Sequence, residues 1–276
     1  MVFLMGCQHI KTRRIIINKD KNIGRVIYVV EGEKKEFNLL KLIFTKIFDY
    51  SFVEVKGRNK LIPQTAVVYK SKKNINSKIF VVESKNSNIK SVKNSQEYID
   101  NIYKLLFEEF GLDPKKASIY YLFDRDRGSN SDKIILELIC ELKNAIDNGV
   151  NQNGLLLLSY PSIESFVISC FKSDSLNIEI KSNKIKKYLD INKIYQDQID
   201  ENAIIQACNE LIKTIKYLID HCLSESDFDD FEEINKELFN NQELYYKKLS
   251  RYCLLSLLII SLLDLKLIEI ETNYEP

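Results

Sequence analysis

Short apolar runs alternate with amphipathic segments through the first part of the chain. Three runs are rich in β-branched, aromatic or leucine side chains, and each predicts a strand buried on both faces: RVIYVV at 25–30, SIYYLF at 118–123 and GLLLL at 154–158. Segments with helical spacing of apolar residues lie between them, at 37–48, 95–110 and 132–148. Gly111 and Gly149 follow the last two segments and predict their ends. Alternating strands and helices predict a mostly parallel, Rossmann-like α/β sheet with helices on both faces.

Weaker strand signals fall between the first two runs. Residues 51–55 predict a short strand, and 65–69 and 78–82 flank a polar, lysine-rich stretch. Two apolar segments around a polar turn predict a hairpin or an insertion at the sheet edge.

The character of the sequence changes near residue 180. The later segments with helical spacing lie near 186–197, 202–222, 228–239 and 242–264, and the alternating residues 265–270 predict a final strand. We therefore expect an α/β domain at 1–180, with a lysine-rich insertion at about 56–93, and a helical C-terminal domain at 181–276.

Composition narrows the class of protein. The chain has 276 residues, of which 45% are hydrophobic and 29% charged, so it has enough apolar surface to fold. Its 8 glycines and 4 prolines are too few for a turn-rich all-β sandwich. The net charge of +1 indicates neither nucleic-acid nor membrane binding, so only the distribution of charge is informative.

Cysteine and histidine usage argues against a structural zinc site. The 6 cysteines form no C-x-x-C pair, and there are only 2 histidines. The apolar start at 1–5 is too short for a signal peptide, so we expect reduced thiols and a cytoplasmic protein. The longest apolar run, 254–263, is far shorter than the roughly 20 residues that cross a bilayer, so it predicts a buried helix and no membrane contact.

Carboxylates follow the predicted strands. Glu31 comes directly after the first run, and Asp124 and Asp126 follow the second. Ligands of parallel sheets bind beyond the carboxyl ends of the strands, so these three acids converge if the strands are neighbours. Crowded carboxylates repel one another unless a cation lies between them, and Mg²⁺ or Mn²⁺ prefers oxygen ligands. The alternative is ordinary turn formation or helix capping by the aspartates. Gly32 is expected to permit a sharp turn after Glu31.

Two of these segments resemble a known family. V-V-E-G at 29–32 and F-D-R-D at 123–126 look like the two signature motifs of the TOPRIM fold, and the resemblance covers roughly 24–170. That fold is shared by type II topoisomerases, bacterial primases and several nucleases. E-G-E-K-K-E at 31–36 and Y-P-S-I-E-S-F at 160–166 resemble the RloB-like and overcoming-lysogenization-defect branch, whose anti-phage members often work beside an ATPase.

The resemblance implies roles for individual residues. Glu31 would act as general acid or base and bind metal, and Asp124 and Asp126 would hold the cation. Ser162 and Glu164 match a later Ser-x-Glu pair that contacts metal in those relatives. A second ion, about 4 Å from the first in two-metal sites, would need Glu164 together with Glu36. Many relatives have an acid four residues after the first Glu, where this chain has Lys35.

Basic residues supply candidates for substrate binding. Residues 56–93 contain 10 Lys and Arg against a single Glu, a patch that suits phosphates but equally suits a solvated insertion protecting an edge strand. Arg125 and Arg127 flank the proposed metal site and are the better candidates for a substrate clamp. The full set of candidate substrate-binding residues is Lys34, Arg125, Arg127, Lys72 and Lys73.

These observations predict a Mg²⁺- or Mn²⁺-dependent endonuclease that cleaves DNA or structured RNA, including tRNA. The resemblance implies the effector of an anti-phage system with an ATPase partner, and the helical C-terminal segments are candidates either for forming a homodimer or for docking that partner. Two alternatives remain. One is a non-catalytic TOPRIM-like module bound to an ATPase, which Lys35 favours, and the other is an RNA-processing ribonuclease.

Overall fold

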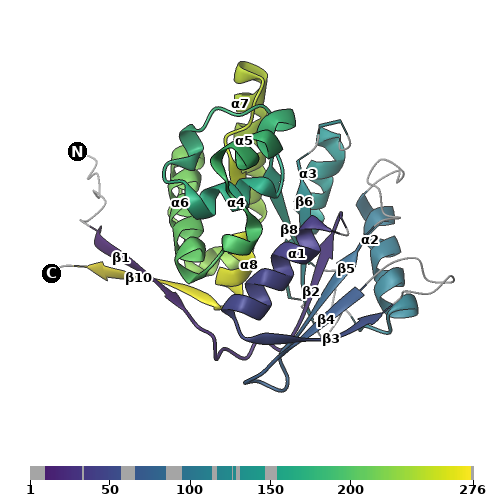
Figure 1. Ribbon diagram of the computed structural model, residues 1–276. Helices are drawn as coiled ribbons and strands as arrows, with labels where there is room; N and C mark the ends of the chain where they lie inside the picture. The colour runs from purple at the N-terminus through teal and green to yellow at the C-terminus, as the bar shows by residue number, and fades with distance from the viewer. Residues whose placement is uncertain are drawn as a thin grey trace, which may run out of the picture.

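The computed structural model describes residues 10–32, 34–56, 66–84, 95–113, 117–125, 127–128, 131–146 and 154–274. Its centre is an 8-stranded mixed sheet (Figure 1). The spatial order is β3 (Tyr50–Lys56), β4 (Ala66–Ser71), β5 (Lys78–Glu83), β2 (Arg25–Val30), β6 (Ser118–Asp124), β8 (Gly154–Tyr160) and β7 (Lys143–Asn144), and β9 (Leu255–Ser256) also pairs with β8.

The middle of the sheet is parallel. β2 pairs in parallel with β5 on one side and with β6 on the other, and β6 pairs in parallel with β8. Because β2 comes first along the chain and has later strands on both sides, the direction of winding reverses between β2 and β6. The carboxyl ends of these two strands therefore meet at a topological switch point, where open α/β sheets bind ligands. The predicted mostly parallel α/β sheet is confirmed.

Helices cover both faces of this sheet (Figure 1). On one face, the Tyr28 ring lies 5.6 Å from Phe44, and its hydroxyl donates to Ser261 Oγ at 3.0 Å. Phe44 belongs to a π-helical turn (Ile43–Ile47) that extends α1 (Lys35–Leu42), and Ser261 belongs to α8 (Leu258–Asp264). On the other face, α2 (Ser95–Lys104), with its own π-helical turn at Leu105–Glu109, contacts α3 (Asp132–Glu141).

The C-terminal part packs against the same sheet. It contains α4 (Glu164–Phe171), α5 (Ile185–Asn192), α6 (Glu201–Ile219), α7 (Glu232–Leu249) and α8. Buried side chains of α6, α7 and α8 belong to one continuous hydrophobic core with those of β2, β6 and β8. This contact brings the ends of α5 and α7 near the carboxyl edge of the sheet.

Three of the predicted helices, at 132–148, 228–239 and 242–264, have bounds that differ from those in the structure. The segment 132–148 ends as a helix at Glu141, because Lys143 and Asn144 pair with β8 instead; Gly149 lies outside the described residues. The helices expected at 228–239 and 242–264 are instead α7 and α8, and α7 runs through the expected gap. Ser250, with φ of 53°, ends α7, and β9 precedes α8. Apolar spacing continues across these breaks, so the pattern alone cannot locate them.

The two ends of the chain form a separate antiparallel pair. β1 (Ile10–Ile17) pairs with β10 (Ile268–Tyr274) (Figure 1), so the strand expected at 265–270 begins three residues later. The apolar run at 254–263 is buried, as predicted. Among the described residues, no helix combines the length and the apolar character needed to cross a membrane.

Candidate active site

The switch point brings two of the predicted acids together. Glu31 follows the last residue of β2, and Asp124 is the last residue of β6. The Asp124 backbone N–H donates to Glu31 Oε2 at 3.3 Å, although 93 residues separate them in the sequence. Asp126 lies outside the described residues.

Glu36 reaches the same place from the first turn of α1. Its side chain is buried, and a Cβ built on Gly32 would lie 2.6 Å from Glu36 Oε2. The chain does turn here between β2 and α1, but Gly32 does not adopt a positive φ in doing so. Gly32 is instead needed for space, since only a residue without a side chain lets the Glu36 carboxylate approach the backbone so closely.

The segment between β8 and α4 forms the third side. The Ile163 N–H donates to Asp124 Oδ1 at 2.7 Å, which fixes this carboxylate against the start of α4. Glu164 is buried and forms an ion pair with the Lys35 ammonium group. The Ser162 hydroxyl is buried beside Glu164 but makes no hydrogen bond of ordinary geometry.

Crowding changes the acidity of these groups. Burial raises the pKa of Asp124 well above its usual range, and the charges of Glu36, Glu31 and Glu164 raise it further. The hydrogen bond from the Ile163 N–H lowers the pKa but does not offset these effects. Burial also raises the pKa of Glu36. Burial alone would raise the pKa of Glu164, but the hydrogen bond from Lys35 and the nearby Ser162 hydroxyl lower it overall. Burial and the neighbouring carboxylates therefore make it harder for Asp124 to carry its negative charge.

Some of the carboxylates at this site are suitable ligands for a hard divalent cation. Glu31, Glu36 and Asp124 offer only oxygen atoms, which Mg²⁺ and Mn²⁺ prefer. Within the described ranges, no three Asp, Glu, His or Cys side chains already surround a common point, so binding would have to draw these carboxylates together. Glu164, the predicted ligand of a second ion, is paired with Lys35. The Lys35 ammonium group, on α1, therefore lies next to Glu164, the acid that a second ion would need.

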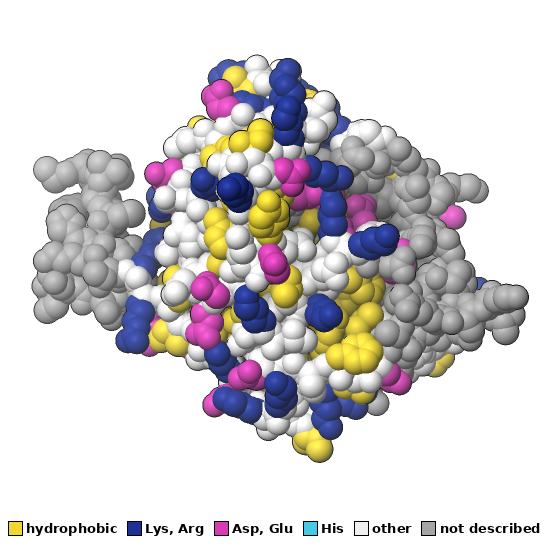
Figure 2. All heavy atoms as spheres, in the orientation of Figure 1, with side chains coloured by type: hydrophobic (Ala, Val, Ile, Leu, Met, Phe, Trp, Pro, Cys, Tyr) yellow, Lys and Arg dark blue, Asp and Glu magenta, His cyan; other side chains and the backbone are white. Residues whose placement is uncertain are grey.

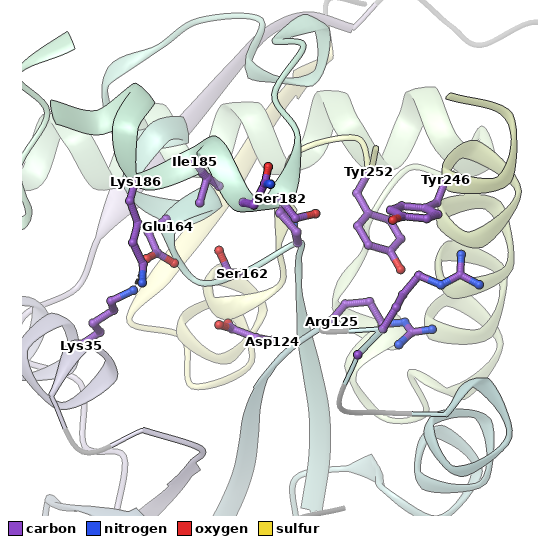
Figure 3. A pocket seen from close by; sticks show the side chains of 14 residues that line it. Lys35, Asp124, Arg125, Ser162, Glu164, Ser182, Ile185, Lys186, Tyr246 and Tyr252 are labelled. Carbon is purple, nitrogen blue, oxygen red and sulfur yellow. Dashed lines mark hydrogen bonds and ion pairs between the residues drawn. The ribbon is translucent and has the colours of Figure 1, made fainter. Parts of the chain in front are cut away.

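A cavity of about 480 Å³ opens beside the acids. In Figure 3, Lys35, Lys186 and Glu164 lie on one side, Tyr246 and Tyr252 on the other, and Asp124 and Ser162 between them. The complete lining is Lys35, Asp124, Arg125, Arg127, Gly128, Pro161, Ser162, Glu164, Ser182, Asn183, Ile185, Lys186, Tyr246 and Tyr252.

Arg125 does not have the predicted role of a substrate clamp. Its side chain is fully buried, with Nε donating to Glu243 Oε1 at 2.8 Å and Nη2 paired with Asp132. The guanidinium carbon also lies 5.3 Å from the centre of the Phe239 ring. Arg125 thus ties the end of β6 to α3 and α7, and it cannot turn toward a substrate without breaking its ion pairs with Glu243 and Asp132.

The other predicted cations divide into two groups. Arg127 remains accessible, with 32% of its side chain exposed; it pairs with Glu243 Oε2 at 3.2 Å and lines the cavity. Lys34 is exposed just before α1, so it stays a candidate. On the face shown in Figure 2, lysines and arginines are interspersed with acidic and apolar side chains rather than gathered in one stripe.

Lys72 and Lys73 lie at the wrong end of the sheet to serve this site. They precede β5, which runs parallel to β2, so they lie near the start of β2. Lys73 pairs with Asp20, and the Lys78 N–H donates to Gly24 O at 2.8 Å. A strand of 6 residues spans roughly 20 Å. These two lysines are therefore separated from the acids by the whole length of β2.

Sequence reasoning missed the contribution of the C-terminal helices. Lys186, Tyr246 and Tyr252 line the cavity but lie far along the chain from every motif. Glu83, a buried acid, ends β5 opposite Val30 at the same edge of the sheet. Glu83 directly follows the apolar segment 78–82, so the signal that marks Glu31 could also have found it. No local pattern marks Lys186, Tyr246 and Tyr252, because only tertiary packing places them at the cavity.

The sequence matches no protein-family model, and no curated protein is detectably similar to it. The resemblance to TOPRIM proteins therefore depends on the V-V-E-G and F-D-R-D segments and on where they lie in the fold. Val29 and Val30 are the last residues of β2, Phe123 and Asp124 are the last residues of β6, and these two strands are parallel neighbours.

Proposed function

We propose that this protein is a TOPRIM-type, divalent-cation-dependent endonuclease that hydrolyses phosphodiester bonds of DNA or structured RNA. The observation that carries the proposal is the contact of the Glu31 carboxylate with the Asp124 backbone at the switch point between β2 and β6. Glu36 and Glu164 lie close enough to Asp124 for their charges to raise its pKa. Acids grouped beside a cavity at this position are typical of a hydrolytic site.

The residues can divide the chemistry as follows. Glu31, Glu36 and Asp124 would hold the cation, which would stabilise charge on the scissile phosphate and polarise the attacking water. The Asp124 N–H holds Glu31 Oε2 and the Ile163 N–H holds Asp124 Oδ1, so one oxygen of each carboxylate is fixed by a backbone hydrogen bond. Glu31 is the proposed general acid or base that moves the proton of the attacking water or leaving oxygen. Lys35 contributes a fixed positive charge beside Glu164.

The biological setting is part of the same proposal. The likeness to anti-phage TOPRIM nucleases suggests an effector in the cytoplasm that works with an ATPase partner. The partner and the homodimer stay predictions. α5 and α7, which border the cavity, are the elements through which such a partner would most directly affect cleavage.

One observation favours a second function. The Lys35–Glu164 ion pair balances one acid of the cluster from within the chain. A cluster balanced in this way could serve in a non-catalytic TOPRIM-like module that docks on an ATPase. The two functions differ in whether the remaining acids take up a divalent cation.

Cleavage assays with matched variants test the nuclease. Purified protein is incubated with DNA and with structured RNA in Mg²⁺ or Mn²⁺, alone and with any ATPase that co-purifies. We expect Glu31→Gln and Asp124→Asn to abolish cutting without unfolding the chain. Glu141→Gln, an exposed acid at the far end of α3, should cut like the unmodified protein. Cutting that persists in both site variants would contradict the proposal.

A further inference from the structure

The cavity beside the acids has two chemically different walls. Figure 3 shows Lys35 and Lys186 pointing toward Glu164 on one side and the rings of Tyr246 and Tyr252 on the other. The lysines come from α1 and α5, and Tyr246 comes from α7. A ligand that fills the cavity therefore meets positive charge at one end and aromatic surface at the other.

The lysine wall has an excess of positive charge. Lys35 pairs with Glu164, while Lys186 forms no ion pair with any residue in the described part of the chain. Lys186 is exposed at its position on α5 yet lines the cavity. Two ammonium groups beside a single paired carboxylate can accept another anion, and a phosphate is an anion that compact ammonium groups commonly bind.

The opposite wall is suited to a planar group. The Arg127 guanidinium carbon lies 4.6 Å from the centre of the Tyr246 ring, and the Tyr246 and Tyr252 ring centres are 4.7 Å apart. Glu243 holds both Arg127 and the Tyr252 hydroxyl, the latter at 2.8 Å. Aromatic rings and arginine planes are the surfaces on which proteins stack unpaired bases.

The size of the cavity limits what can enter. A volume of about 480 Å³ falls within the range of about 300–1,000 Å³ that is typical of small-molecule sites. Such a space has room for one nucleotide unit, whereas a base inside a duplex is covered by its neighbours and its pairing partner. A base can enter only if it is unpaired or flipped out.

We propose that the cavity binds one unpaired nucleotide, with its phosphate between Lys35 and Lys186 and its base against Arg127 and Tyr246. This inference rests on the proposed nuclease function and specifies its substrate class. Cleavage would then fall at single-stranded segments, loops or ends rather than within continuous duplex. Asp124 lies between the two walls, so the bound phosphate is next to the acids.

Binding without cleavage separates this inference from the nuclease itself. The probe is a fluorescently labelled single-stranded oligonucleotide, and its anisotropy is measured in a chelating buffer that prevents cutting. We expect Lys186→Gln and Tyr246→Leu each to weaken binding about tenfold, since one stacked base or one phosphate contact is worth about that much. Lys187→Gln, the adjacent exposed lysine that does not line the cavity, is the matched control and should bind normally.

A duplex of the same sequence should bind more weakly than the single strand. Equal affinity for duplex and single strand, or equal losses in Lys186→Gln and Lys187→Gln, would overturn the inference. Lys186 is exposed, so its replacement tests the cavity even if Tyr246→Leu fails to fold. Selective single-strand binding without any metal-dependent cutting would contradict the nuclease and leave the nucleotide site standing. Metal-dependent cutting of duplex and single strand alike would contradict the nucleotide site and leave the nuclease standing.

Discussion

Replacing the buried Arg125 with methionine tests whether an internal ion pair holds the end of β6 against α7. The Arg125 side chain has no exposed surface, and it pairs with Glu243, whose side chain is only 6% exposed. Glu243 Oε1 also accepts a hydrogen bond from the Tyr252 hydroxyl at 2.8 Å. Methionine keeps much of the volume of arginine but removes its charge, so it leaves Glu243 facing an apolar side chain.

The expected size of the effect follows from the partners that remain. Breaking a buried ion pair by removing one member destabilises a protein by about 3–5 kcal/mol. Glu243 keeps Tyr252 and Arg127, so we expect Arg125→Met to lower the free energy of unfolding by about 3 kcal/mol. Glu243→Met takes one carboxylate partner away from the buried Arg125 guanidinium and should cost about 3–5 kcal/mol. The double variant removes both charges, so its loss should fall at least about 2 kcal/mol short of the sum.

Urea unfolding followed by circular dichroism measures all four corners of this cycle. Lys143→Met is the control, because its pairs with Asp230 and Glu232 lie at the surface and should contribute little to stability. If the double variant loses as much free energy of unfolding as the two single variants together, within about 0.5 kcal/mol, the proposed coupling of Arg125 to Glu243 is refuted. The Arg125 guanidinium would then be solvated and would not tie β6 to α7.

Two further substitutions test the packing of the site and of the sheet face. Gly32→Ala places a Cβ 2.6 Å from Glu36 Oε2, so this carboxylate must move. We expect metal-dependent cleavage to fall by roughly tenfold to a hundredfold, with little change in melting temperature. Unchanged cleavage would contradict the close approach of Glu36 to Gly32. Asp264→Asn tests a partly buried acid that accepts a hydrogen bond from the Tyr120 hydroxyl and whose pKa is raised by burial. The stability that Asp264 contributes is complete below its ordinary pKa of 3.8 and is lost as the pH rises through the raised value. The Asp264→Asn variant should therefore melt at a higher temperature than the unmodified protein near pH 7, and this gain should vanish near pH 4. A gain in melting temperature that is equal at every pH would argue against a destabilising negative charge on Asp264.

Local patterns were sufficient to predict the parallel core and the meeting of Glu31 with Asp124. RVIYVV and SIYYLF are continuous apolar runs, and such runs form central strands whose ends collect at one edge of the sheet. Because both acids end strands that flank the switch point, their proximity follows once the strands are neighbours. The apolar run at 254–263 was likewise a reliable sign of burial.

Long-range packing decided the rest. Arg125 looked like a substrate ligand because it stands between two aspartates, but its partner Glu243 is 118 residues away. Lys72 and Lys73 were candidates for substrate binding because they belong to a basic stretch, but the parallel pairing of β5 with β2 places them at the opposite end of the sheet. Neither fact leaves a trace in the sequence near these residues, because ion-pair partners and strand neighbours are set by the tertiary fold.

Calorimetric titration of Mn²⁺ tests the central claim most directly, because it detects cation binding whether or not the protein needs a partner in order to cut. The account predicts that the unmodified protein binds Mn²⁺, that Glu31→Gln and Asp124→Asn abolish or severely weaken the binding, and that Glu141→Gln binds normally. An unmodified, folded protein that takes up no Mn²⁺ with Glu31, Glu36 and Asp124 all intact would contradict it, and would favour the non-catalytic module in which Lys35 supplies the positive charge.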